Sequence, residues 1–254
     1  MRYLYIFCWS VFLFISCICC NSKPKQTEEE KKAQEIVDKA IAVHGGENFT
    51  NINIAFDFRD RHYTAHRNNG KYTYARSFRD STGQAVEDIL TNDYFKRKIN
   101  RQEVDLSAER KTAFSESVNS VIYFALLPYG LNDQAVQKTY LGETTIKQQP
   151  YHKIKVSFEQ EGGGIDYEDE YIYWIHQKTF RVDYLAYSFH TDGGGLRLRV
   201  AYNPQIVGGI RFQQYINYEP QQKSAKLLDL DQLYESGQLK ELSRIELKNI
   251  KVLE

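Results

Sequence analysis

The stretch Ser115–Leu131, SESVNSVIYFALLPYGL, decides the fold of this chain. It is the one sustained apolar run in a body that otherwise reads as alternating strands. Apolar residues recur in it at helical spacing, namely Val118, Val121, Ile122, Ala125 and Leu126. Tyr123 and Phe124 make the opposite side apolar too, and a helix that is apolar nearly all round is either buried or crosses a membrane. Because a membrane span needs about 20 apolar residues, we expect a short buried helix.

The ends of this helix are marked by Ser115 or Ser117, either of which could cap its start, and by Pro128 after its last turn. The polar segment Asn100–Glu116 before it is expected to be a loop. Space beside the helix would form a ligand cavity, whose candidate lining residues are Val118, Val121, Ile122, Ala125, Leu126 and Tyr129.

The rest of the body shows the two-residue period of β-strands. The expected strands are 54–60, 62–68, 72–79, 94–99, 140–146, 151–158, 168–175, 180–189, 196–202, 210–218 and 242–253. In the last one, the apolar alternation changes phase at a bulge. In Leu196–Tyr202, Arg197 and Arg199 alternate with apolar residues, which predicts that both arginines lie on a solvated face.

These elements predict a mainly β (α+β) fold. We expect about 10–12 antiparallel strands in one large curled sheet or half-open barrel, because large twisted sheets curl. An N-terminal helix over Ala33–His44, ended by Gly45-Gly46, and the central helix would pack on the concave face. His44 falls in the last turn of its helix, where a histidine is favoured by the helix dipole.

The N-terminus reads as a targeting segment, with Arg2 followed by an apolar run and a small residue before Cys17. We expect a lipoprotein signal peptide at residues 1–16, a lipidated Cys17 with a flexible tether at 17–32, and one β domain at 33–254. Cys20 is the second choice for lipidation, and an uncleaved anchor helix is the alternative. The lipid anchor predicts a membrane-bound protein of the cell envelope, at the periplasmic face of the outer membrane or at the cell surface.

Composition excludes several classes of function. The chain has 254 residues with 33 basic and 33 acidic side chains, so it offers no electrostatic case for binding nucleic acid. All four cysteines lie within the first 20 residues, which leaves the body without a disulfide or a thiolate metal site. No nucleotide-binding or hydrolase motif occurs, and we expect no cofactor and no metal.

Two segments combine a carboxylate with three glycines, and both fall between expected strands. Consecutive glycines allow close approach of a ligand to the backbone, so the two loops could form a polar rim that binds a head group or an ion. Its candidate residues are Glu161, Gly162, Gly163, Gly164, His190, Asp192, Gly193, Gly194 and Gly195. The alternative is that these glycines serve turns that need positive φ.

An acidic cluster follows the first glycine run and comprises Asp166, Glu168, Asp169 and Glu170. It lacks the ligand spacing of a calcium loop. We interpret it as a solvated strand face paired with Arg197 and Arg199.

Three segments carry a resemblance to a known family: SVNSVIYFALLPYGLND (Ser117–Asp133), FEQEGGGIDYEDEYIYW (Phe158–Trp174) and LAYSFHTDGGGLRLR (Leu185–Arg199). They resemble a family of uncharacterised lipoproteins from Bacteroidetes, a domain of unknown function called DUF6503. The resemblance implies a fold like that of LolA and LolB, an incomplete antiparallel barrel whose helices cover an apolar cavity. In LolA and LolB this cavity shelters the acyl chains of lipoproteins. The family provides no catalytic residues to carry over.

The leading hypothesis is therefore a lipid-anchored, non-enzymatic envelope protein that binds a lipid or another hydrophobic ligand in the cavity of a half-barrel, or whose curled sheet shelters its own central helix instead. An envelope enzyme, or a protein that binds a polar ligand or a metal ion, at the His190, Asp192 and Glu161 rim is one alternative. A scaffold subunit of an envelope complex, suggested by tyrosines expected at the surface, is another.

Overall fold

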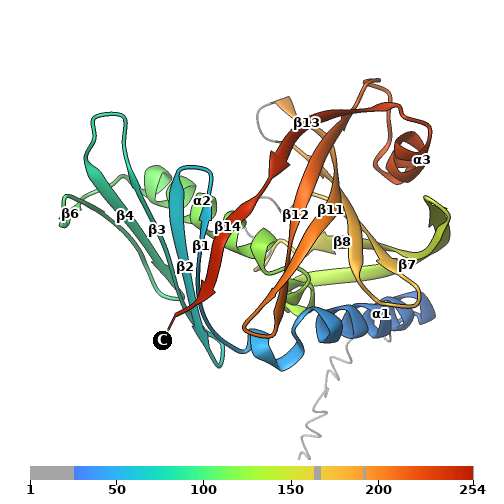
Figure 1. The fold of residues 1–254 in the computed structure, drawn as a ribbon, viewed down its shortest axis with the longest axis horizontal. Coiled ribbons are helices and arrows are strands. Elements are labelled where there is room, and N and C mark those ends of the chain that lie inside the picture. The colour runs from blue at the N-terminus through green and yellow to red at the C-terminus, as the bar shows by residue number, and fades with distance from the viewer. Residues whose placement is uncertain (1–25, 163–166, 191–192, 254) are drawn as a thin grey trace, which may run out of the picture.

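The computed structural model describes residues 26–162, 167–190 and 193–253 of the chain. This part is mainly antiparallel β, with two seven-stranded sheets and three α-helices (Figure 1). The expected class is confirmed, with more strands than the ten to twelve foreseen. The predicted signal peptide, Cys17 and Cys20 lie outside the described residues.

Each sheet is an antiparallel meander of neighbouring strands. Sheet A contains, in spatial order, β14 (Leu247–Val252), β1 (Asn51–Phe58), β2 (Arg61–Asn68), β3 (Lys71–Arg79), β4 (Ala85–Thr91), β5 (Phe95–Ile99) and β6 (Gln102–Val104). Sheet B contains β13 (Leu239–Ile245), β12 (Ile210–Pro220), β11 (Gly195–Val207), β10 (Val182–Phe189), β9 (Tyr171–His176), β8 (Gln149–Phe158) and β7 (Val136–Ile146). Within the described chain neither sheet closes into a barrel.

The two sheets are joined at Glu246, which separates β13 from β14. β13 pairs with β12 of sheet B, whereas β14 pairs with β1 of sheet A. Figure 1 shows this red C-terminal segment running between the two sheets. The single bulged strand expected at 242–253 is therefore wrong, because the phase change marks the point where the chain passes from one sheet to the other.

Two strands, β4 and β6, are absent from the sequence prediction. In β4 the inward-facing residues are Val86, Asp88 and Leu90, so a carboxylate interrupts the apolar alternation on which the prediction depends. Asp88 is tolerated inside because Arg76 and Arg97 both bind it. β6 has three residues, too few to show a period.

Helix α1 (Glu28–His44) begins earlier than the expected Ala33. Thr27 and Glu30 form a reciprocal capping box, in which Thr27 Oγ1 accepts from the Glu30 backbone and Glu30 Oε2 accepts from the Thr27 backbone. This cap stabilises a first turn that has no apolar stripe. The buried side of the helix packs on the concave face of sheet B, where Ala33, Ile36, Val37 and Ala40 meet residues such as Ile154, Val156 and Tyr173.

His44 at the end of α1 is 1% exposed, and its Nδ1 lies 2.8 Å from the carbonyl oxygen of Ala40. Burial lowers the pKa of His44 from 6.5 to about 4. The ring is therefore neutral at neutral pH, and the expected interaction of a charged histidine with the helix dipole is wrong.

Helix α2 (Ala108–Ala125) contains the first part of the central apolar run, Ser115–Ala125. Its N-cap is Ser107, whose Oγ accepts from the backbone of Arg110, so the predictions of Ser115 or Ser117 as the cap are wrong. Its first turns, expected as a loop, are solvated and polar. A 3-10 turn, η2 (Tyr129–Asn132), follows Pro128.

The outer face of sheet B is covered by α3 (Leu230–Glu235), which follows a 3-10 turn, η4 (Leu227–Asp229). Leu230 packs there against Trp174 and Leu198. Asp231 accepts a hydrogen bond from Trp174 Nε1 at 3.2 Å and lies 3.2 Å from Lys153 Nζ. Sheet B thus has helices on both faces. α3 covers its outer face, and α1 and α2 lie on its concave face, where α2 also packs against sheet A.

Candidate functional site

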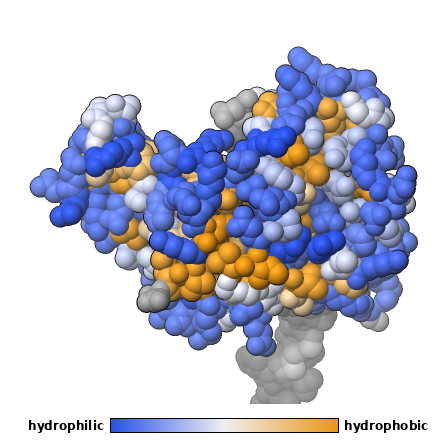
Figure 2. Space-filling view, in the orientation of Figure 1, coloured by the Kyte–Doolittle hydropathy of each residue, from blue (hydrophilic) through white to orange (hydrophobic). Residues whose placement is uncertain are grey.

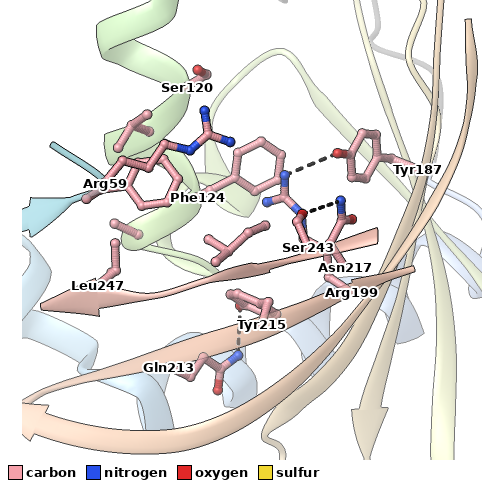
Figure 3. A pocket seen from close by; sticks show the side chains of 14 residues that line it. Arg59, Ser120, Phe124, Tyr187, Arg199, Gln213, Tyr215, Asn217, Ser243 and Leu247 are labelled. Carbon is pink, nitrogen blue, oxygen red and sulfur yellow. Dashed lines mark hydrogen bonds between the residues drawn. The ribbon is translucent and has the colours of Figure 1, made fainter. Parts of the chain in front are cut away.

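A cavity of about 310 Å³ lies between α2 and the concave face of sheet B, close to the Glu246 junction (Figure 3). Three parts of the fold enclose it. α2 forms one wall, the concave residues of β10–β13 form the second, and the β1–β2 turn with Leu247 of β14 forms the third. The cavity is open to solvent, because Arg59, Ser120 and Ser243 in its lining are exposed.

The two sides of α2 have different environments, which divides the predicted cavity residues. Val118, Ile122 and Leu126 are buried against sheet A in a cluster with Ile54, Tyr63 and other core residues. Val121 and Ala125, together with Ser120 and Phe124, line the cavity.

Tyr129, the remaining candidate, lies outside the cavity lining. Its ring stacks on Phe49 with centroids 5.0 Å apart, and the guanidinium of Arg67 lies 4.7 Å from it. The structure therefore places two of the six candidates, Val121 and Ala125, at the cavity.

The sheet wall of the cavity consists of two rows of side chains across neighbouring strands. Arg199, Asn217 and Ser243 are directly opposite one another on β11, β12 and β13 and form a polar row. Ala201, Tyr215 and Ile245 form the adjacent row, in which Tyr215 and Ile245 line the cavity. Such an arrangement suits an amphipathic ligand, because polar and apolar groups meet within one cavity.

Arg199 is the unexpected member of the lining. It is 9% exposed, its guanidinium carbon lies 4.0 Å from the centroid of the Phe124 ring, and its Nη2 donates to the Tyr187 hydroxyl at 3.1 Å. The prediction that Arg199 faces solvent is wrong. β11 has two covered faces, with Leu198 packed on the α3 side, so alternation along this strand does not separate a wet face from a dry one.

Two amide side chains complete the polar part of the lining. Gln213 donates to the carbonyl oxygen of Val182 and to the Tyr215 hydroxyl, and Asn217 donates to Ser243 Oγ at 3.4 Å. Their oxygens, Gln213 Oε1 and Asn217 Oδ1, are buried and have no hydrogen-bond partner within the described protein. Burial raises the pKa of Tyr215, so its hydroxyl stays protonated at neutral pH.

The predicted polar rim is only partly within the described residues, since Gly163, Gly164 and Asp192 lie outside them. The two loops leave the same end of sheet B, after β8 and β10. His190 Nδ1 lies 3.4 Å from Asp169, whereas Glu161 and Gly162 line a separate depression with Asp133 and Glu159. The glycines that are described, Gly162, Gly193, Gly194 and Gly195, have positive φ, as turns require.

The acidic cluster is divided among several partners. Glu170 pairs with Lys155, and Asp169 with His190, while Asp166 lies outside the described residues. Arg197 lies 3.9 Å from Glu219, and the ion pairs of the described residues join neither Arg197 nor Arg199 to Glu168, Asp169 or Glu170, so the expected pairing with the two arginines is wrong for the described members. Across the described ranges, no three His, Cys, Asp or Glu side chains come close enough to hold a metal ion.

The tyrosines expected at the surface are largely internal. The tyrosines that the structure describes are buried or half-buried, and Tyr94 is the exception at 51% exposed.

Figure 2 shows a different apolar surface, at the β11–β12 turn beside the end of β14. There Ile206 is 74% and Val252 52% exposed, and Gly208 (φ +59°) leaves room for Val252 where a Cβ would meet it at 2.7 Å. Neither Ile206 nor Val252 lines the cavity.

The described helices include none with the length and apolarity needed to cross a bilayer.

Among solved structures, the chain is similar to a LolA superfamily protein from Nitrosomonas europaea, with 14% identity, a TM-score of 0.48, and coverage of 87% of this chain and 94% of that one. It is also similar to a DUF1329 family protein from Desulfovibrio piger, with 10% identity, a TM-score of 0.41, and coverage of 87% and 92%.

A third similar structure is a Vibrio parahaemolyticus domain described as an outer membrane lipoprotein-sorting protein, with 7% identity, a TM-score of 0.42, and coverage of 81% and 98%. Curated protein sequences include none that is significantly similar to this chain. One family model matches residues 9–247, nearly the whole sequence, and the chain belongs to that family, the family of unknown function DUF6503.

Proposed function

We propose that this protein binds one hydrophobic or amphipathic ligand in the cavity between α2 and sheet B, as a lipid-anchored protein of the cell envelope. The observation that carries the proposal is the cavity itself. α1 and α2 fill most of the space within the curled sheets, yet about 310 Å³ remains beside Val121 and Ala125. This volume is at the lower end of the range of ligand pockets, about 300–1,000 Å³.

The shape and lining of the cavity favour binding over catalysis. Phe58, Phe124, Ile245 and Leu247 provide apolar surface, and an apolar ligand would gain free energy by leaving water there. Among the described lining residues there is no carboxylate, histidine or cysteine to act as a general base or nucleophile. The lining therefore supports binding more directly than catalysis.

Photoaffinity labelling tests the proposal. The full-length protein, held in amphipol, is irradiated with a palmitic-acid analogue that carries a diazirine in its chain, and the labelled peptides are identified by mass spectrometry. We expect labels on the peptides of α2 and of β12–β14 that face the cavity, and competition by unlabelled palmitic acid.

A matched pair of variants locates the label. Ala125→Trp places a large ring in the cavity, whereas Lys111→Trp adds the same ring on the exposed first turns of α2. A125W should lose most of the labelling and K111W should retain it, with unfolding temperatures measured for both. Equal labelling of both variants, or labels scattered over the outer surface, would show that the cavity is not the binding site.

The membrane anchor is a separate part of the proposal and rests on the residues before Cys17. Cells grown with radiolabelled palmitate should incorporate label into the wild-type protein and into Cys20→Ser, but not into Cys17→Ser. Loss of label in Cys20→Ser alone would move the anchor to Cys20.

A further inference from the structure

We propose that the ligand is a single-chain anionic amphiphile whose carboxylate or phosphate is bound by Arg199. This inference deepens the proposed function and rests on it. It names the chemical class of the ligand and the residue that recognises its head group.

Arg199 is a buried cation without a counter-ion among the described residues. Its side chain is nine-tenths buried, and no Asp or Glu of the described chain lies within 4.0 Å of its nitrogens. Its Nε has no hydrogen-bond partner in the described protein. A guanidinium is always charged and has five N–H donors, and an unpaired buried charge is costly.

The contacts that Arg199 does make are weak substitutes for an anion. The faces of Phe124 and Tyr187 lie 4.0 and 5.1 Å from its guanidinium carbon, so cation–π attraction offsets part of the burial cost. Stacking on these rings fixes the guanidinium in position, and only one of its N–H groups, on Nη2, is used in the hydrogen bond to the Tyr187 hydroxyl. A fork held in this way is preorganised for a carboxylate or phosphate, which it can bind through two hydrogen bonds.

Neighbouring hydroxyl groups add donors to the same place. The Tyr187 hydroxyl accepts from Arg199 and Ser243 Oγ accepts from Asn217, so each hydroxyl keeps its own proton for donation. In Figure 3 Tyr187, Arg199, Asn217 and Ser243 gather on one side of the cavity. The anionic head group would lie on this side.

The charge of the whole cavity agrees with an anionic ligand. Its lining includes two arginines, Arg59 and Arg199, and none of the described lining residues is acidic. Arg59 is exposed and lies near Leu247, across the cavity from Tyr187 (Figure 3). Arg59 would attract anions from solution, while Arg199 would bind them out of water, where a charged contact is stronger.

The apolar side of the cavity accepts the chain of the ligand. Phe58, Val121, Ala125, Ile245 and Leu247 belong to four elements and provide apolar surface on all three walls. In Figure 3 Leu247 lies opposite the polar group, with Phe124 between the two. One chain suits a cavity of about 310 Å³, which is small for a ligand with several chains.

The test compares three diazirine probes on the full-length protein in amphipol: the palmitic-acid analogue, its fatty alcohol, and the corresponding lysophosphatidic acid. We expect at least one anionic probe to label the cavity peptides at about tenfold lower concentration than the alcohol. A hydrogen bond to a charged group strengthens binding by at least about this factor. The acid and the lysophosphatidic acid distinguish a carboxylate from a phosphate ligand.

Variants then assign the effect to Arg199. Arg199→Met keeps the length of the side chain and removes its charge. It should bring labelling of the cavity peptides by the anionic probe down to the level that the alcohol reaches. Arg199→Lys should recover part of the difference, because it restores the charge but not the planar fork. Arg197→Met is the matched control, on the same face of β11 but outside the cavity lining.

The outcomes separate this inference from the proposed function. If the acid, the lysophosphatidic acid and the alcohol label wild-type protein equally, or if R199M and R197M behave alike, anion recognition by Arg199 is overturned while binding in the cavity stands. If no probe labels the cavity peptides, both are overturned. The unfolding temperature of R199M should be no lower than that of wild type, which excludes misfolding as the cause of a loss.

Discussion

Arg76 and Asp88 form an ion pair inside the protein, with Arg76 Nε and Nη2 at 2.9 and 2.5 Å from Asp88 Oδ2 and with side chains 2% and 0% exposed. Arg97 binds the same carboxylate at 2.6 Å. Arg76 also donates to Ser117 Oγ on α2 at 2.7 Å. The pair thus connects β3 and β4 to the helix that forms one wall of the cavity.

Replacement of Asp88 by asparagine should lower the free energy of unfolding by about 3–5 kcal/mol, because it leaves buried guanidinium groups without a counter-charge. Urea denaturation followed by circular dichroism measures the change. Glu87→Gln is the control on the same strand, where Glu87 is half exposed and pairs with Lys98, and it should cost less than about 1 kcal/mol. Similar losses in the two variants would contradict the structural role of the buried pair.

The junction between the sheets gives a second matched pair of variants. Leu247 follows Glu246, is 6% exposed and packs in the core under α2. Leu247→Ala should destabilise the protein by about 2–5 kcal/mol through lost contacts and a new cavity. Leu242→Ala, on β13 and 43% exposed, should change stability by less than about 1 kcal/mol. An equal effect of the two in urea denaturation would show that Leu247 does not hold the sheets together.

The docking of α3 provides a third prediction. Asp231 is 3% exposed and binds both Trp174 and Lys153. Asp231→Ala should loosen α3 and speed tryptic cleavage after Lys226 about tenfold, because buried partners lose a charged hydrogen bond. Asp229→Ala, an exposed neighbour, should be cleaved at the wild-type rate. Mass spectrometry of timed digests gives both rates, and identical rates would count against the role of Asp231.

The strands that the sequence predicts correctly share one property. Apolar side chains that face the interior alternate in them with more polar side chains that face outward. Where a charged residue is inside, this signal fails. Asp88 conceals β4, since its two arginine partners come from other strands and cannot be found from local spacing. The early start of α1 also lacks a periodic signal, and its capping box at Thr27 and Glu30 is the pattern that could have revealed it.

The cavity could not be predicted because it depends on contacts between elements that are far apart in the sequence. The helical spacing of the central apolar run shows that α2 is buried, but not which of its sides meets the core and which meets a cavity. Val118 and Val121 look equivalent in sequence, yet Val118 is fully buried against sheet A, whereas Val121 is only partly buried and also lines the cavity. Arg199 alternates with apolar neighbours as a solvated residue does, and only the cover of α3 on one side of β11 and α2 on the other places it inside.

The stability of the protein should depend on pH through His44. His44 is 1% exposed, and its pKa falls from 6.5 in the unfolded chain to about 4 in the folded one. Between these values the unfolded state binds a proton that the folded state does not, so stability is complete above pH 6.5 and is lost as the pH falls towards 4. The loss attributable to His44 is about 3 kcal/mol over this range.

Urea denaturation at several pH values should therefore give a shallower pH dependence for His44→Gln than for wild type. His66→Gln, which changes an exposed histidine, should keep the wild-type dependence, and parallel curves for wild type and H44Q would contradict the assignment.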